Sequence, residues 1–298
     1  MDQSIKAMPG VAGTDMHYLS DFENGQNFRL TVRLDAHVSE QQAASVGSGF
    51  VDQMQRHHLG SHRVELDLNY PATPRVKSSY LPDYSQATFK LGDNASPPMD
   101  LTGSDVGAST AAWLRAVRSP IAEYASLTQP AWGGPATSRD IEITLKPDAT
   151  SASATALQHS DPALSVATWR VMVVTEQSYR PQEYTSKPNP PSDRDMALWR
   201  QITDVVGLRT DASGSTQISV EHSQAETQID AGLPSGPDAR TTAFSVADLA
   251  RQFDHPVQLT LRTGDGPVEV IVGGCERHDA GHRRLPLEIE MSHIYEKC

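Results

Sequence analysis

Cysteine is almost absent from this sequence, which has only Cys275 and Cys298 in 298 residues. A chain with so few cysteines cannot build the disulfide framework of a small secreted domain, so we expect a protein of the reduced cytoplasm. Long apolar runs are also missing, because no stretch approaches the roughly 18 residues that a membrane-spanning helix needs. Residues 1–20 lack an apolar segment behind a basic start, so the sequence as written predicts no secretion signal and no membrane association.

Basic residues are outnumbered by acidic ones, and the formal net charge is −12. A non-specific nucleic-acid binder neutralises phosphates with clustered Lys and Arg, so this charge argues against such a function. The same charge favours solubility and, where the protein has a partner, a cationic one. Aromatic residues make up only 6% of the chain. Together with plentiful Gly and Pro, this predicts many turns and modest hydrophobic cores.

The motifs of common catalytic chemistries are missing as well. There is no phosphate-binding G-x-x-x-x-G-K, no G-x-G-x-x-G after a strand and no H-E-x-x-H. Gly47-Ser48-Gly49 lacks the glycine two residues before the serine that a nucleophile elbow requires, and it lies inside a predicted helix. These absences favour a non-catalytic interaction or structural protein, either a subunit of a larger assembly or a binder of a cationic partner.

The first half of the chain contains its clearest local pattern. Residues 1–26 are polar and without periodicity, which predicts a mobile N-terminal arm. Phe28–Leu34 and Val64–Tyr70 alternate apolar and polar residues, as half-buried strands do. Between them, residues 39–58 form a predicted helix with Val46, Phe50 and Met54 on its buried face. We therefore expect a strand–helix–strand unit here.

Helices are predicted from Ser104, from Pro120, over Met196–Val206 and from Ser245, and the segment between 146 and 164 is predicted to be a loop. The turn-rich segment 128–138 is a candidate boundary. We therefore expect an N-terminal half over 27–135 and a C-terminal half over 136–298. A helix followed by a strand recurs along the chain without a fixed period. The predicted fold is α+β: two halves, each a mostly antiparallel sheet with helices packed on one face.

The C-terminal end, residues 257–295, is predicted to form three consecutive strands, Val257–Arg262, Val268–Val272 and Leu285–Ile294. The connection before the third strand carries Cys275, His278 and His282. Thiolate and imidazole are ligands that zinc prefers, and this short spacing lets one loop supply several of them. Cys298 or His293 would have to complete the site. Read without a metal, the same segment is a solvated loop in which Cys275 is a lone thiol.

His57, His58 and His62 form a second histidine group at the end of the helix predicted over 39–58. A metal site here would require His62 to fold back across Gly60. The simpler interpretation is a histidine that satisfies carbonyls at the helix end. Trp132, beside two glycines, is the tryptophan expected to be exposed and able to anchor a partner, whereas Trp113, Trp169 and Trp199 fall on apolar stripes.

Two function classes follow from these patterns. The preferred one is the interaction or structural protein, with a protein partner or self-assembly. The alternative is a metal-dependent enzyme that uses Cys275, His278 and His282 of the C-terminal loop with zinc. A small-molecule carrier with an apolar pocket is also compatible with the sequence.

Overall fold

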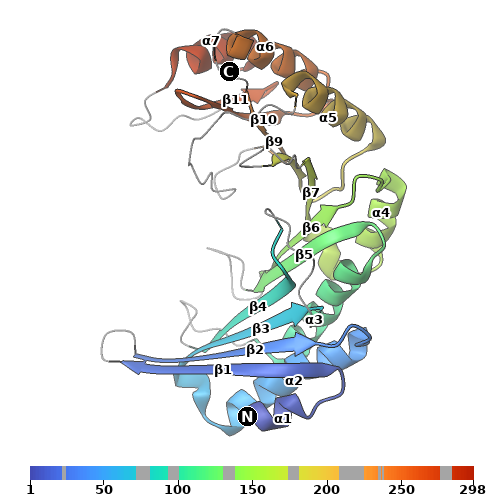
Figure 1. Cartoon of the computed structure of the whole chain (residues 1–298), viewed down its shortest axis with the longest axis vertical. Coiled ribbons are helices and arrows are strands. Elements are labelled where there is room, and N and C mark those ends of the chain that lie inside the picture. Colours follow the sequence, from blue (N-terminus) through green and yellow to red (C-terminus); the bar gives the residue numbers. More distant parts are fainter. Residues whose placement is uncertain are drawn as a thin grey trace. The chain divides into compact units, whose positions relative to one another are not determined.

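The structure is a computed structural model that describes residues 1–21, 25–71, 81–92, 101–129, 138–173, 181–207, 225–233, 236, 238–275 and 284–298 (Figure 1). The chain divides into two compact units. Unit 1 comprises residues 1–149 and 153–167, and unit 2 comprises residues 150–152 and 168–298. Helices and sheet strands occur in both units, which confirms the α+β class.

Unit 1 contains six of the strands and most of four α-helices. They are α1 (Asp2–Lys6), β1 (Val11–Asp21), β2 (Gly25–Leu34), α2 (Glu40–Arg56), β3 (Arg63–Tyr70), β4 (Ser85–Gly92), α3 (Gly103–Arg118), β5 (Ala122–Gln129), β6 (Asp140–Leu145) and α4 (Ser151–His159), with short 3₁₀ segments at Leu59–Ser61 and Pro162–Val166. The helix α2 begins at Ser39, whose side chain accepts a hydrogen bond from the Gln42 N–H in a reciprocal capping box.

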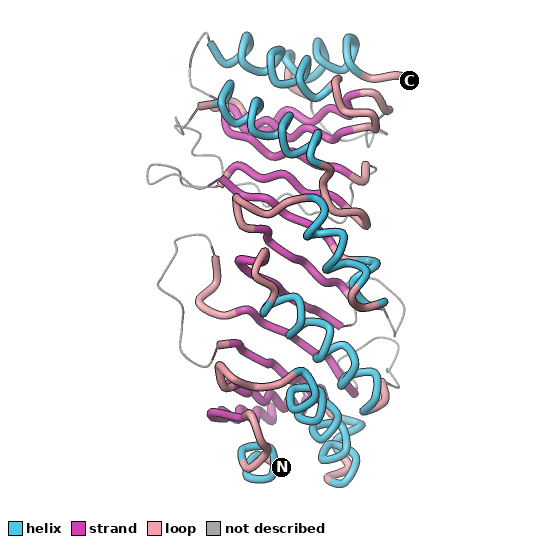
Figure 2. Tube along the Cα trace, turned by 90° about the vertical axis from the view of Figure 1, so that its right-hand side faces the viewer, coloured by secondary structure: helices cyan, strands magenta, loops and turns pink. Residues whose placement is uncertain are grey.

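The strands of unit 1 follow one another in the sheet in chain order. The pairs β1–β2, β3–β4 and β5–β6 are antiparallel, whereas β2–β3 and β4–β5 are parallel. Each parallel pair needs a crossover, which α2 and α3 provide. Such crossovers are almost always right-handed, and these advance the sheet in one direction, so the helices fall on the same face (Figure 2).

The core of unit 1 lies between that face and the helices. Leu30, Leu66 and Phe89 point toward it from three neighbouring strands, and Phe50 and Trp113 come from α2 and α3; all five are fully buried. The two helices approach each other closely at glycines. A Cβ on Gly107 of α3 would lie 3.0 Å from the carbonyl oxygen of Ala44 in α2. The sequence thus permits the helix contact by omitting a side chain there.

The opposite face of the unit 1 sheet carries charged side chains. The Arg29 guanidinium lies 2.6 Å from Oδ2 of Asp67 and 3.1 Å from Oε1 of Glu65. The Thr88 hydroxyl donates a 2.7 Å hydrogen bond to the other oxygen of Asp67. Burial, and then the nearby Asp67 carboxylate, raise the pKa of Glu65. The acidic side chains here are therefore paired within the chain.

Unit 2 consists of β7 (Thr168–Val173), β8 (Gln182–Ser186), α5 (Asp193–Val206), β9 (Thr227–Gly232), α6 (Asp238–Ala250), β10 (Val257–Thr263), β11 (Gly266–Val272) and α7 (Pro286–Tyr295). The pairs β7–β8, β8–β9 and β10–β11 are antiparallel, and β9–β10 is parallel. The helices α5, α6 and α7 again cover one face (Figure 2). Tyr184, Trp199, Ile229 and Leu259 form part of the buried core.

Several sequence-based predictions match these elements. The strand at Phe28–Leu34, the helix over 39–58, the strand Val64–Tyr70 and the hairpin β10–β11 are present, and the predicted apolar faces are buried. The strands form mixed sheets rather than mostly antiparallel ones, because the pairs β2–β3, β4–β5 and β9–β10 are parallel. The predicted boundary between residues 135 and 136 falls between β5 and β6, which pair within unit 1. The division into compact units instead lies between residues 149 and 168.

The N-terminal arm is a correction. Residues 1–26 contain α1 and the eleven-residue strand β1, which pairs with β2 from Val11 to Asp21. The reason lies in the position of the strand. From Asp15 to Ser20 both faces of β1 are exposed, so its sequence needs no apolar alternation.

Three other predictions of secondary structure are wrong. The helix expected from Pro120 is the strand β5, and the loop expected between 146 and 164 contains α4. The third C-terminal strand, Leu285–Ile294, is the helix α7. Its alternating Leu and Ile residues suggested period two, but the buried residues are Glu288, Met291, Ser292 and Tyr295, which have helical spacing. Pro286 at the first helical position favours this start. The helix α6 begins at Asp238 rather than at Ser245.

Candidate functional site

The edge strand β1 is the first candidate site. Within the described residues no strand pairs with the side of β1 that faces away from β2. An exposed edge presents unpaired N–H and C=O groups, and natural proteins protect such edges with Lys, Pro, bulges or a covering segment. The sequence of β1, VAGTDMHYLSD, contains neither Lys nor Pro, and its register shift lies at its start, between Val11 and Gly13. This edge is therefore able to pair.

Apolar side chains gather on the same strand. The exposed fractions of Met16, Tyr18 and Leu19 are 50%, 48% and 51%. These three residues lie within four consecutive positions. Asp15 and His17 alternate with them and are exposed as well. A strand with exposed apolar side chains and a free edge is a suitable surface for another strand.

The edge of β11 in unit 2 is different, because the C-terminal segment covers part of it. The Gly273 N–H donates to the Tyr295 carbonyl at 3.0 Å, and the Lys297 N–H donates to the Gly274 carbonyl at 2.8 Å. The Ile271 N–H, within β11, donates to Oε1 of Glu296 at 3.2 Å. A disulfide between Cys275 and Cys298 holds this segment in place. The chain thus protects this edge with its own C-terminal segment, whereas Asp15–Ser20 of β1 are exposed among the described residues.

A polar cluster in unit 2 is the second candidate site. The loop between α6 and β10 carries Asp254 and His255, and Thr227 begins β9. His255 Nδ1 lies 2.9 Å from Oδ1 of Asp254, and His255 Nε2 lies 2.8 Å from Oγ1 of Thr227. The hydrogen bond with His255 lowers the pKa of Asp254. The imidazole is therefore held at both nitrogens, between an exposed carboxylate and a buried hydroxyl.

Asp195 approaches the same cluster from the first turn of α5. One oxygen of Asp254, one oxygen of Asp195 and one ring nitrogen of His255 all lie within 4.8 Å of one another. Oδ2 of Asp195 accepts a hydrogen bond from the Ser192 N–H at 3.0 Å, which fixes the carboxylate at the helix start. The fully buried Tyr184 lies nearby, and burial, followed by the charge of Asp195, raises the pKa of its hydroxyl.

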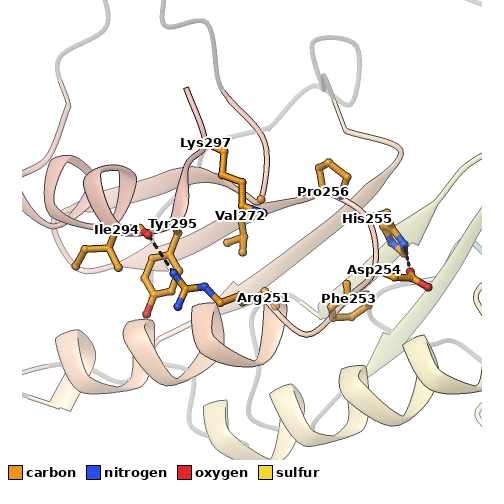
Figure 3. A pocket seen from close by; sticks show the side chains of 11 residues that line it. Arg251, Phe253, Asp254, His255, Pro256, Val272, Ile294, Tyr295 and Lys297 are labelled. Atoms are coloured by element: carbon orange, nitrogen blue, oxygen red, sulfur yellow. Dashed lines mark hydrogen bonds and ion pairs between the residues drawn. The ribbon is translucent and has the colours of Figure 1, made fainter.

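A pocket of about 250 Å³ adjoins this cluster in unit 2. Figure 3 shows Asp254 and His255 at one end of it and Arg251, Tyr295 and Lys297 toward the other. Arg251 donates a 3.2 Å hydrogen bond to the Ile294 carbonyl and lies over the Tyr295 ring. The pocket therefore combines an acidic and histidine end with a cationic end.

The metal site predicted at Cys275, His278 and His282 loses its cysteine ligand in the structure. Cys275 Sγ is bonded to Cys298, with 4.9 Å between the two Cα atoms, so the sulfur is neither a lone thiol nor a free thiolate ligand. His278 and His282 lie outside the described residues, and the histidine part of the site stays a prediction. The expectation of a reduced compartment rested on the small number of cysteines. The Cys275–Cys298 pairing removes that argument, and the cytoplasmic location stays a prediction.

The second histidine group is not brought together as a metal site. His57 and His58 follow α2, with the His57 N–H donating to the Gln53 carbonyl at 3.0 Å, and His58 adopts a left-handed conformation with a φ of 55°. In the described part of the chain, the group with metal-ligand spacing is that of Asp195, Asp254 and His255. Trp132 lies outside the described residues, whereas Trp113, Trp169 and Trp199 are buried, as predicted.

Sequence reasoning missed both candidate sites. Met16 to Leu19 belong to the segment that was predicted to be an unstructured arm. Asp195 and His255 are 60 positions apart in the sequence and come from α5 and from the loop after α6. The adjacent pair Asp254-His255, just before a proline and a strand, was the one local signal available.

None of the described helices is both long and apolar enough to cross a membrane. Comparison with known proteins gave no matching family model, no similar curated protein and no similar solved structure.

Proposed function

We propose that this chain is a non-catalytic interaction protein that acts as a subunit of an assembly, and that β1 is its assembly surface. The observation that carries the proposal is the free edge of β1 with Met16, Tyr18 and Leu19 exposed on it. The partner is a second copy of the chain, whose β1 adds to this edge in antiparallel orientation.

Pairing of two β1 strands satisfies the main-chain groups at the edge and removes apolar side chains from water. Main-chain hydrogen bonds provide affinity in such strand additions, and the side chains provide specificity. In a symmetric antiparallel pair, the two-fold axis passes between two identical, directly opposed residues. The possible registers of β1 with itself are therefore few.

The pairing of Asp15 with His17 selects one of these registers. With the axis at Met16, Asp15 of each copy lies opposite His17 of the second copy, and this contact occurs twice. With the axis at His17, the two histidines face each other and Asp15 faces the apolar Leu19. A carboxylate opposite an imidazole can form a hydrogen bond with it, whereas like charges directly across a strand pair destabilise it. The Met16-centred register is therefore the one we propose.

Binding of a cationic partner is the second form of this function, favoured by the net charge of −12. On the described face of the unit 1 sheet, however, Arg29 already pairs with Glu65 and Asp67. This pairing makes self-assembly the better supported form. The alternative of a metal-dependent enzyme on the C-terminal loop would need ligands other than Cys275, because that sulfur is in a disulfide.

The first test is the mass of the full chain in solution by light scattering over a range of concentrations. We expect a concentration-dependent species of twice the 32.4 kDa chain mass. Met16→Lys places two cations opposite each other at the axis and should leave a monomer. Val205→Lys is the matched control, because Val205 is an exposed apolar residue, 41% accessible, on α5. A wild-type monomer at all concentrations, or a dimer that tolerates Met16→Lys, would refute the proposal.

The second test addresses the register. Asp15→Lys places a lysine opposite His17, and His17→Asp places an aspartate opposite Asp15, so each variant alone should be monomeric. An equimolar mixture of the two should form a heterodimer, because the introduced lysine of one copy then faces the introduced aspartate of the other, and the unchanged His17 faces the unchanged Asp15. Failure of the mixture to associate, while Met16→Lys still abolishes the wild-type dimer, would exclude the Met16-centred register and keep the edge as the interface.

A further inference from the structure

We infer that Asp195, Asp254 and His255 form a binding site for a divalent transition metal of the Zn²⁺ class. The inference is independent of the proposed assembly through β1, because all three residues belong to unit 2. It concerns ligands that share no residue with the predicted site at Cys275, His278 and His282.

The ligand spacing is the first observation. Atoms of the three side chains lie within 4.8 Å of one another. Two ligands bound at about 2.0–2.2 Å to a tetrahedral Zn²⁺ lie about 3.4 Å apart, so the three atoms would have to draw closer by side-chain rotation. Nδ1 of His255 and Oδ1 of Asp254 are already 2.9 Å apart. To share one ion with Asp195, these two side chains would have to rotate toward its carboxylate.

The second observation is the partner of the other imidazole nitrogen. A metal-bound histidine usually donates its second ring N–H to an oxygen that fixes the tautomer and the ring orientation. His255 Nε2 lies 2.8 Å from Oγ1 of Thr227, whose side chain is buried. Nδ1 faces Asp254 and donates to its carboxylate in this structure. A bound ion would replace the Nδ1 proton, with the remaining Nε2–H donated to Thr227. Thr227 is thus a positioning residue rather than a ligand.

The chemistry of the ligands and their exposure select the class of ion. Two carboxylates bring two negative charges, which a divalent cation balances, and an imidazole favours Zn²⁺ and its neighbours over Mg²⁺ or Ca²⁺. The Asp195 side chain is fixed in the capping box of α5 and is 8% exposed, which gives the site one rigid ligand. The side chain of Asp254 is 73% exposed and that of His255 33%, which gives an ion a path from solvent.

The decisive measurement is calorimetric titration of the chelator-stripped, untagged full chain with ZnCl₂. We expect one site per chain, with affinity reduced at least tenfold in His255→Gln and in Asp254→Asn. Asp265→Asn is the matched control, because Asp265 is an exposed acid in the turn between β10 and β11. The double variant His278→Gln/His282→Gln should bind as the wild type does. Absence of Zn²⁺ binding, or binding that survives His255→Gln, would overturn the inference.

Thr227 provides a test of positioning. Thr227→Val removes the acceptor for Nε2–H and should weaken Zn²⁺ binding about tenfold, and Thr227→Ser should restore it. Equal affinity in the Val and Ser variants would remove Thr227 from the site. If a ligand variant fails to fold, the absorption spectrum of the Co²⁺-loaded wild type still shows which kinds of side chain bind the metal. Bands of a nitrogen and oxygen ligand set without sulfur charge transfer support this site, and sulfur charge transfer contradicts it.

Discussion

The Tyr295 hydroxyl donates a 2.8 Å hydrogen bond to Oδ1 of Asp248, which joins α7 to α6. The ring of Tyr295 is buried against Phe244, which also belongs to α6, with 6.0 Å between the two ring centroids. This contact fixes the C-terminal segment as a packed helix and places the chain end beside β11. Its strength should depend on pH, because the hydroxyl must keep its proton to donate.

Tyr295→Phe should lower the free energy of unfolding by about 1 kcal/mol at neutral pH, the typical net value of a hydrogen bond. Burial, and then the hydrogen bond to Asp248, raise the pKa of Tyr295 from its ordinary 10.0 to about 12. The folded state therefore holds this proton more tightly than the unfolded state. The contribution is fully present below pH 10 and is lost as the pH rises from 10 to 12.

Urea denaturation of wild type and Tyr295→Phe at neutral pH and across pH 10–12 measures this effect. The difference between the two proteins should shrink over that range. Tyr84→Phe is the control, because Tyr84 precedes β4 in unit 1 and lies outside both this contact and the β1 edge, and it should not reproduce the effect. A stability difference that is constant from neutral pH to pH 12 would contradict the role of the Tyr295 proton.

Gly107→Val should destabilise unit 1 by about 1–3 kcal/mol, the usual cost of inserting atoms into a packed contact. The reason is that even a Cβ at this position would lie 3.0 Å from the backbone oxygen of Ala44. Ala108→Val introduces the same β-branched side chain at the next, exposed position of α3 and should cost much less. The melting temperatures of the Gly107→Val and Ala108→Val proteins measure this difference. Equal decreases in the two variants would show that α2 and α3 can move apart without cost.

Cys298→Ser should lower the free energy of unfolding by about 3 kcal/mol, because the Cys275–Cys298 disulfide closes a loop with a sequence separation of 23. The expected reduction follows from the larger conformational freedom of the unfolded chain. Wild type treated with dithiothreitol should match the variant, and the variant should not respond to the reductant. A wild-type melt that is insensitive to dithiothreitol, with two free thiols found by titration, would contradict the disulfide.

Elements with one buried face could be predicted from the sequence. Phe28, Leu30 and Val32 alternate because β2 is covered by helices on one side only, and Val46, Phe50 and Met54 recur every four residues because α2 packs along one stripe. In such elements the periodicity of the sequence reflects burial directly. The helix-then-strand recurrence is visible for the same reason, although its period varies.

Elements whose burial is unusual could not be predicted in this way. β1 lacks alternation from Asp15 to Ser20 because neither face is covered there. Around the start of α7, Leu285, Leu287 and Ile289 suggested a strand, yet the exposed fraction of Ile289 is 42% while the charged Glu288 is buried. Glu288 tolerates this burial because Arg284 pairs with it at 2.9 Å, a relation that apolar periodicity does not reveal.

The sequence alone determined the α+β class, most of the strongly periodic elements and the position of the main buried side chains, because local spacing encodes which face meets the core. Tertiary structure alone decided which edge stays free, that the two cysteines pair, and that Asp195 and Thr227 meet His255. These relations join residues that are far apart in the chain. No local pattern records such distances, because they arise only when the strands and helices have packed.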